Sequence, residues 1–238
     1  MLKLITDIAL VIGGYLIGAF PYMLLLSRAK GFHISVEEDF HLTVWRNVGR
    51  LEGFSGVLVD ILKGVIVILI GWLLGFSLNV IALAGVAVVI GQMWPVFQKF
   101  NGEKGNTTGA GMGITLTSFI GGGAVIAFGC CLVCFAIGFL IRTVPRFIVK
   151  GQTLNEKLKL GGPVSNSLPV GMLAGFAVIP LVSWLLNQPV ELIWASAAVC
   201  ILIIIRRLTA NLDKDLKAPR TSTARIMFNR FLFDRSYY

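Results

Sequence analysis

The amino-acid sequence predicts an all-α membrane protein, a polytopic bundle of about seven transmembrane helices. The chain of 238 residues is 56% hydrophobic and only 14% charged, and its mean hydropathy is +0.83. Soluble domains are about 45–50% apolar and about 25% charged. Several apolar runs reach the ~18–20 residues that a helix needs to cross the hydrocarbon core of a bilayer. Basic residues occur in alternate connections, which indicates both the number of crossings and their direction.

Seven apolar runs give the expected transmembrane helices. The first, Ile5–Leu26, is too long for the apolar core of a signal peptide and lacks a small-x-small cleavage pattern. The others are Val57–Leu78, Val80–Phe97, Thr107–Ile120, Gly123–Ile141, Ser167–Leu186 and Glu191–Ile205. The fourth is short, and Gly121–Gly123 separates it from the fifth, because consecutive glycines disfavour a helix and favour a turn. Six crossings remain the alternative if the third and fourth runs are shallow or re-entrant.

Lysine and arginine residues predict the orientation. They gather in the first, third and fifth connections and in the tail after Ile205, whereas the short second, fourth and sixth connections have none. Cytoplasmic loops carry such an excess of basic residues, so we expect the N-terminus outside and the C-terminus in the cytoplasm. Lys3 is the one basic residue on the other side. The net charge of +9 then serves orientation and attraction to anionic membrane lipid, and nucleic acid is not an expected partner.

We expect one membrane-embedded domain over residues 1–221 and a distinct tail over residues 222–238. The tail mixes three arginines with aromatic and aliphatic side chains. This composition is typical of a helix that lies in the interface of the inner leaflet. The predicted role of the tail is anchoring.

Two ionisable residues, Asp60 and Lys63, fall inside the second apolar run. Their spacing of three places both on one face of a helix. Charges within a span usually face the bundle interior and pair or line a polar path. Two interpretations stay open: the residues form a structural polar pair that holds helices together, or they support a polar site.

The segment Gly91–Met112 carries the strongest functional signal. It places Lys104 between glycines in a short polar loop that joins two apolar runs. Glycines let a backbone approach a ligand closely, and an ammonium group binds a phosphate or a carboxylate. The sequence therefore predicts that an anionic head group binds here, at the bilayer surface. The alternative is that the glycines serve only the turn and that the lysine is solvated.

The polar groups expected on the cytoplasmic side include cations and neutral donors but no strong general base. They are Arg46, Lys104, Thr107, Thr108, Ser165 and Asn211. The sequence contains no HExxH zinc motif, no Gly-x-Ser-x-Gly elbow and no cysteine beside a histidine. Such a site binds phosphates through cations and backbone N–H groups, which also stabilise developing negative charge. The proton transfer is then left to the substrate's own groups, and no metal is expected.

A series of short motifs runs along the chain. These are GxxPxxLLL at Gly18–Leu26, DxxKG at Asp60–Gly64, GQMWPVF through GEKG at Gly91–Gly105, VS at Val164–Ser165, and a late Asn211. Their order resembles the bacterial membrane glycerol-3-phosphate acyltransferases of the PlsY type. The resemblance implies seven spans in the bacterial plasma membrane, with the motif-bearing loops in the cytoplasm.

The resemblance also implies an activity. A fatty acyl group passes from acyl phosphate to the sn-1 hydroxyl of glycerol 3-phosphate, which gives lysophosphatidic acid for phospholipid biosynthesis. No cofactor, metal or coenzyme A takes part. The catalytic residues that this implies are Lys104, Asn211, Ser165 and Gln92. The substrate-binding residues are Arg46, Gly102, Gly105, Thr107 and Thr108.

Several departures from the family pattern motivate a second hypothesis. The chain has Gln92 where the family has a histidine, Trp94 for a phenylalanine, Glu103 for a glycine and Leu208 for a late histidine, and the glycine-rich first loop is reduced to Asp39–Arg46. An amide orients a phosphate or a hydroxyl but does not accept a proton at neutral pH. The alternative is a catalytically inactive relative that binds lipid or a partner.

A third hypothesis is a small transporter that uses Asp60 and Lys63 as a polar path. Transporters of this kind usually contain a matching pair of interrupted helices in two halves. The sequence shows no such pair, so this hypothesis ranks last.

Overall fold

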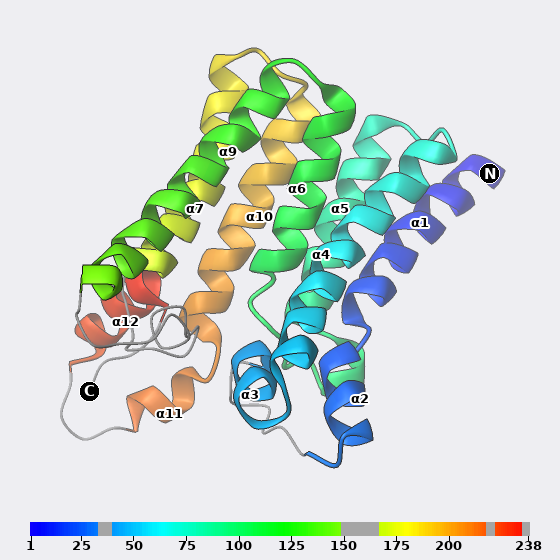
Figure 1. The fold of residues 1–238 in the computed structure, drawn as a ribbon. Coiled ribbons are helices and arrows are strands. Elements are labelled where there is room, and N and C mark those ends of the chain that lie inside the picture. The colour runs from blue at the N-terminus through cyan, green and yellow to red at the C-terminus, as the bar shows by residue number, and fades with distance from the viewer. Residues whose placement is uncertain (33–39, 149–166, 218–221, 235–238) are drawn as a thin grey trace.

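The computed structural model describes residues 1–32, 40–148, 167–217 and 222–234. Within these ranges all regular elements are helices, and the long ones stand side by side in a bundle (Figure 1). The helices are α1 (Leu2–Ala19), α2 (Tyr22–Ala29), α3 (Phe40–Asn47), α4 (Arg50–Leu73), α5 (Leu78–Met93), the 3₁₀ turn η1 (Val96–Gln98), α6 (Asn106–Ile120), α7 (Gly123–Ile148), α9 (Ser167–Leu185), α10 (Val190–Thr209), α11 (Leu212–Leu216) and α12 (Thr223–Phe233).

The short helices collect at one end of the bundle. The N-terminus of the chain lies at the opposite end from α2, α3, α11 and α12 (Figure 1). Among the described residues, six helical segments are long and apolar enough to cross a membrane. The expected short fourth run corresponds to α6, which has 15 residues. The all-α class and the multi-pass character that the sequence predicts are confirmed.

The expected first span is interrupted. α1 ends at Ala19, Phe20 adopts an extended conformation with ψ of 119°, and α2 begins at Tyr22. The cause is Pro21, because proline has no N–H to donate and disfavours helical dihedral angles in the residue before it. The apolar run Ile5–Leu26 therefore contains a bend near its C-terminal end, which hydropathy alone does not reveal.

Several helices extend beyond their apolar runs, α4 and α7 by the most. α4 starts at Arg50, before the expected Val57, and α7 continues to Ile148, past the expected Ile141. Hydropathy marks the part of a helix that lies in lipid, whereas the backbone hydrogen bonds continue into polar residues. The helices are therefore longer than the apolar runs that predicted the spans.

Glycines allow the long helices to pack closely. A Cβ added at Gly91 of α5 would collide with the carbonyl oxygen of Tyr15 in α1, and one at Gly111 of α6 would collide with that of Ile61 in α4. Small residues at such contacts let helices in a membrane approach each other. These glycines thus let α5 pack closely against α1, and α6 against α4. The C-terminal end of α5 lies at the side of the bundle that carries the short helices (Figure 1).

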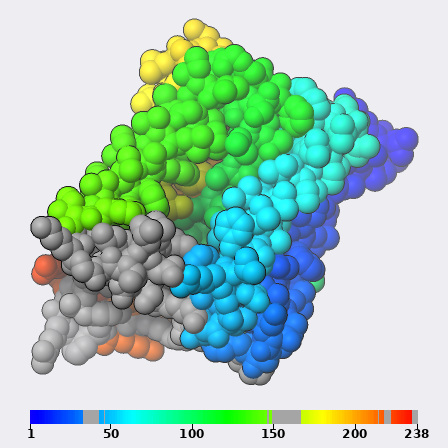
Figure 2. All heavy atoms as spheres, in the orientation of Figure 1, coloured from blue at the N-terminus to red at the C-terminus, as the bar shows by residue number. Residues whose placement is uncertain are grey.

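Apolar side chains also cover the outside of the bundle. Ile5, Ile8 and Ile12 on α1 are 57%, 49% and 54% exposed, and similar residues line the outer side of α7. In the space-filling view, the side chains of α4, α6 and α7 form the near face of the bundle (Figure 2). An extended apolar exterior of this kind marks a surface for lipid rather than for water.

Candidate active site

The predicted phosphate-binding loop lies against the end of α5. The Gly102 N–H donates to the Met93 carbonyl oxygen at 3.1 Å, and the Glu103 N–H donates to that of Gln92 at 3.1 Å. These two bonds attach the connection that leads to α6 to the last turn of α5. The loop that contains Lys104 therefore has a defined conformation.

Two glycines make this conformation possible. Gly105 has a φ of 73°, in the left-handed region, and caps the N-terminus of α6. Residues other than glycine adopt this region at a cost. A Cβ at Gly102 would collide with the Gln92 carbonyl oxygen and with the ring of Pro95. Both glycines thus shape the loop, and other residues would displace it.

Arg206, at the end of α10, holds the same loop from a distant part of the chain. Its Nη2 donates to Asn101 Oδ1 at 2.9 Å and to the Gly102 carbonyl oxygen at 2.5 Å. Its Nε donates to the Glu103 carbonyl oxygen at 3.3 Å. Arg206 is only 6% exposed, and its guanidinium carbon lies 5.9 Å from the centroid of the Trp94 ring, within cation–π range. Sequence reasoning missed Arg206, although a charge at the end of an apolar run could have suggested it.

The N-terminus of α6 begins directly after the loop. The first N–H groups of any helix have no partner within the helix, and they favour a bound anion. Thr108, in the first turn, is fully buried. Its Oγ1 and the Oδ1 of Asn106 make no hydrogen bond within the described parts of the chain. Thr107 and Thr108 therefore bring polar groups to the helix end that follows Lys104.

Lys104 binds a carboxylate from the C-terminal region. Its Nζ lies 2.6 Å from Asp234 Oδ2. The Lys104 side chain is 39% exposed and that of Asp234 is 12% exposed. The ammonium of the loop is thus directed toward Asp234, which directly follows α12, and water reaches the ammonium there.

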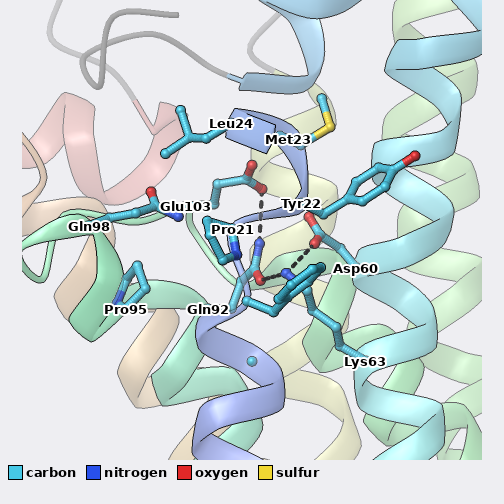
Figure 3. A pocket seen from close by; sticks show the side chains of 12 residues that line it. Pro21, Tyr22, Met23, Leu24, Asp60, Lys63, Gln92, Pro95, Gln98 and Glu103 are labelled. Carbon is cyan, nitrogen blue, oxygen red and sulfur yellow. Dashed lines mark hydrogen bonds and ion pairs between the residues drawn. The ribbon is translucent and has the colours of Figure 1, made fainter. Parts of the chain in front are cut away.

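A second polar cluster lies deeper, between α4 and α5 (Figure 3). Lys63 Nζ lies 2.9 Å from Asp60 Oδ1 and donates to Gln92 Oε1 at 2.6 Å. Gln92 Nε2 in turn donates to Glu103 Oε2 at 3.2 Å. An ammonium donates only and an ionised carboxylate accepts only, so the amide of Gln92 has the one orientation that serves both. Asp60, Lys63 and Gln92 are buried.

This interior cluster, defined as Asp60, Lys63, Gln92 and Glu103, borders a small cavity. The cavity has a volume of about 10 Å³, roughly the space of one water molecule. The bend at Phe20 and Pro21 forms another part of its wall, as do Pro95 and Gln98 (Figure 3). Asp60 and Lys63 therefore pair with one another and also connect, through Gln92, to the loop that carries Lys104.

The structure brings most of the expected site residues together. Six of them lie at the end of α5, in the loop or in the first turn of α6: Gln92, Gly102, Lys104, Gly105, Thr107 and Thr108. Glu103 belongs to this set as well, and the predicted site residues did not include it. The signal available in the sequence was a carboxylate directly beside the lysine.

Three expected site residues are not brought into this set. Asn211 is exposed, in a left-handed conformation with φ of 55°, between α10 and α11. Arg46 belongs to α3, and its side chain is outside the description. Ser165 lies outside the described residues. Their predicted roles stay predictions.

Comparison with known proteins identifies the family. A family model described as glycerol-3-phosphate acyltransferase matches residues 8–217 of the chain. The chain belongs to this family. The resemblance to the PlsY-type glycerol-3-phosphate acyltransferases is thereby confirmed.

Individual relatives agree with the family assignment. Glycerol-3-phosphate acyltransferase 5 of Dehalococcoides mccartyi is 26% identical over 238 residues, which is 96% of this chain and 88% of that protein. The fold is similar to crystal structures of PlsY, an integral membrane glycerol 3-phosphate acyltransferase, in its lysophosphatidic acid and glycerol 3-phosphate forms. The TM-scores are 0.62 and 0.63, at 21% and 22% identity, over 94% of this chain and 99% of that one. At this identity the likeness establishes the fold.

Proposed function

We propose that this protein transfers a fatty acyl group from acyl phosphate to the sn-1 hydroxyl of glycerol 3-phosphate and so forms lysophosphatidic acid. Membership of the glycerol-3-phosphate acyltransferase family supports the acyl transfer and the acceptor. The observation that carries the proposal is the fixed loop at Lys104. This loop and the first turn of α6 bring together three kinds of group: the Lys104 ammonium, the free N–H groups of α6 and the buried hydroxyl of Thr108.

The phosphate group of a substrate would bind to this combination of groups. Lys104 supplies a positive charge, and the N-terminus of α6 supplies backbone N–H donors that point out of the helix. Gly102 and Gly105 keep the loop in this conformation, because a Cβ at either position would collide with the end of α5. Arg46 is the proposed second cation, and Ser165 with Asn211 would orient the reacting groups.

The proposed reaction needs little from the protein beyond binding and charge stabilisation. The sn-1 oxygen forms a bond to the acyl carbon, and the bond from that carbon to the phosphate oxygen breaks. Phosphate leaves and takes up the proton of the hydroxyl. Positive charge and backbone N–H donors stabilise the negative charge that develops on the acyl oxygen and on the leaving phosphate.

Gln92 has a positioning role in this proposal. Its amide links the Lys63 ammonium to the Glu103 carboxylate, so it fixes the residue directly before Lys104. An amide does not accept the proton at neutral pH. The polar pair Asp60 and Lys63 would then support the site from the interior.

We further propose that the loop faces the cytoplasm and that α12 lies in the interface of the bacterial plasma membrane. Phe228 and Phe231 on α12 are 59% and 37% exposed, and Arg225 is exposed as well. Aromatic and basic side chains on one short helix favour the boundary between lipid and water. Residues 1–221 would form the membrane-embedded catalytic domain and residues 222–238 the interfacial tail, with acyl phosphate arriving from the lipid.

An assay of acyl transfer tests the proposal. Purified protein in detergent, given acyl phosphate and glycerol 3-phosphate, should produce lysophosphatidic acid. Lys104→Ala should lower kcat/KM at least ~100-fold, the usual loss when one charge-stabilising group is removed. Lys99→Ala is the matched control, since Lys99 is exposed on the same connection, and it should leave turnover within about twofold. Equal turnover of Lys104→Ala and the wild type would refute the assigned role.

A catalytically inactive, lipid-binding relative is the second candidate. The observations that favour it are the amide of Gln92 in the interior cluster and the ion pair that already engages Lys104. This candidate predicts that the protein binds glycerol 3-phosphate or lysophosphatidic acid without forming product above a lipid-only control. Product above that control would exclude it.

A further inference from the structure

The C-terminal helix α12 lies beyond the part of the chain that matches the family, which ends at residue 217. It nevertheless packs against α9 and α10. Arg207 of α10 joins all three: Nη2 donates to the Pro169 carbonyl oxygen at 2.9 Å, and Nη1 donates to that of Phe231 at 3.3 Å. Arg207 is 2% exposed. The end of α12 is thus attached to the bundle by a buried guanidinium.

A second buried arginine attaches the same helix. Arg230 of α12 is 5% exposed, and its Nε donates to the Leu208 carbonyl oxygen at 3.1 Å. Its other nitrogens bind the Ala210 carbonyl oxygen and the Asp215 carboxylate. Charge-assisted hydrogen bonds of this kind are stronger than neutral ones. α12 therefore has a fixed place beside the end of α10.

This placement determines where Asp234 lies. Asp234 directly follows α12, and its N–H donates to the Arg230 carbonyl oxygen at 3.0 Å. It adopts the left-handed conformation with φ of 59°, which aspartate tolerates better than most residues. Its carboxylate reaches Lys104, a residue 130 positions earlier in the chain. A segment outside the family-matched region thus supplies the partner of the proposed phosphate-binding lysine.

We propose that Asp234 sets the affinity of the site for its anionic substrate by competing with the substrate phosphate for Lys104. This inference rests on the proposed function, in which Lys104 binds that phosphate. A phosphate dianion that approaches the ammonium also approaches the carboxylate, and the like charges repel. Productive binding therefore requires that the Asp234 carboxylate leave the ammonium. The Asp234 carboxylate, which the anchored helix α12 holds at the site, is therefore the autoinhibitory group that the substrate phosphate displaces from Lys104.

The exposure of the two side chains sets the size of the effect. Lys104 is 39% exposed, so solvent screens the pair, whereas Asp234 is only 12% exposed. Exposed ion pairs contribute little, while desolvated ones contribute more. We expect about a fivefold change in anion affinity when the carboxylate is removed, which corresponds to ~1 kcal/mol.

The test compares Asp234→Asn with the wild type in detergent. Asparagine keeps the size of the side chain and tolerates the left-handed conformation, but it carries no charge. The KM for glycerol 3-phosphate and the dissociation constant for inorganic phosphate should both fall about fivefold, with kcat within about twofold. Asp213→Asn is the matched control, because Asp213 is exposed in the nearby α11, and it should change neither constant.

Two further variants make the outcome decisive. In a Lys104→Ala background, Asp234→Asn should no longer raise phosphate affinity, because the ammonium for which the carboxylate and the phosphate compete is absent. If Asp234→Asn fails to fold, as judged by thermal unfolding, Asp234→Gly carries the same expectation, since glycine favours the left-handed region.

The results also separate this inference from the proposed function. If the wild type forms no lysophosphatidic acid but Asp234→Asn binds phosphate more tightly, the proposed function fails and the competition stands. An active wild type whose KM is unchanged, or increased, in Asp234→Asn would overturn the competition. An increased KM would show that Asp234 positions Lys104 for substrate.

Discussion

The two ion pairs of the site differ in how far they are shielded from water. Asp60 and Lys63 lie inside the bundle, with side chains that are 2% and 7% exposed. The Gln92 amide connects this pair to Glu103 through hydrogen bonds. Lys104 and Asp234 meet at the end of the bundle, where the lysine is 39% exposed. A buried charge that loses its partner is very costly, whereas an exposed ammonium can exchange one anion for another. The interior pair suits a fixed support, and the outer pair suits a group that releases its partner to bind substrate.

Removal of one interior charge should have the largest effect on stability. Lys63→Met leaves the Asp60 carboxylate buried beside an apolar side chain, so we expect a loss of about 3–5 kcal/mol in the free energy of unfolding. Chemical unfolding in detergent, followed by circular dichroism, measures it. The double variant Asp60→Leu with Lys63→Met should lose less than the single one. Equal losses would mean that the charges do not act as a pair.

Removal of the Arg206 side chain, which holds the loop at Lys104, should affect catalysis more than stability. Arg206→Ala frees the carbonyl oxygens of Gly102 and Glu103, and the loop that carries Lys104 then loses its defined position. Because small displacements of catalytic groups cost up to ~100-fold, we expect kcat/KM to fall ~10–100-fold. Arg206→Lys should recover part of this, since it restores the charge without the planar fork. Full activity of Arg206→Ala would show that the loop keeps its active conformation without the hydrogen bonds of Arg206.

Changes at Gln92 should have the smallest effect of the three. A neutral imidazole accepts from Lys63 through one nitrogen and donates to Glu103 through the other, so Gln92→His should keep kcat within about threefold of the wild type or raise it. Gln92→Leu breaks both bonds and should lower kcat about tenfold, close to the value of one or two hydrogen bonds. Wild-type turnover of Gln92→Leu would contradict a positioning role for the amide.

The sequence predicted the features that depend on local patterns. Hydropathy located the membrane helices because each needs its own apolar run, and the glycines around Lys104 marked the loop because Gly105 needs a left-handed conformation. The sequence also contained the signal for the bend, which is Pro21 near the end of an apolar run. Hydropathy does not register it, because it measures only how apolar a residue is and not its backbone preference.

Contacts between distant segments could not be predicted in this way. Arg206 reaches a loop about one hundred residues earlier, and Asp234 reaches Lys104 from the far end of the chain. Both contacts depend on how α10 and α12 pack, which no local spacing determines. The tail was expected to serve only as an anchor, whereas its last described residue binds the central lysine of the site.

Direct binding of glycerol 3-phosphate tests the central claim, that the Lys104 loop holds a phosphate. Isothermal titration of the purified protein, without acyl phosphate, should give a dissociation constant that rises at least ~tenfold in Lys104→Ala, the loss expected for one charge-assisted hydrogen bond. Lys99→Ala should bind as the wild type does. Equal affinity of Lys104→Ala and the wild type would contradict the account.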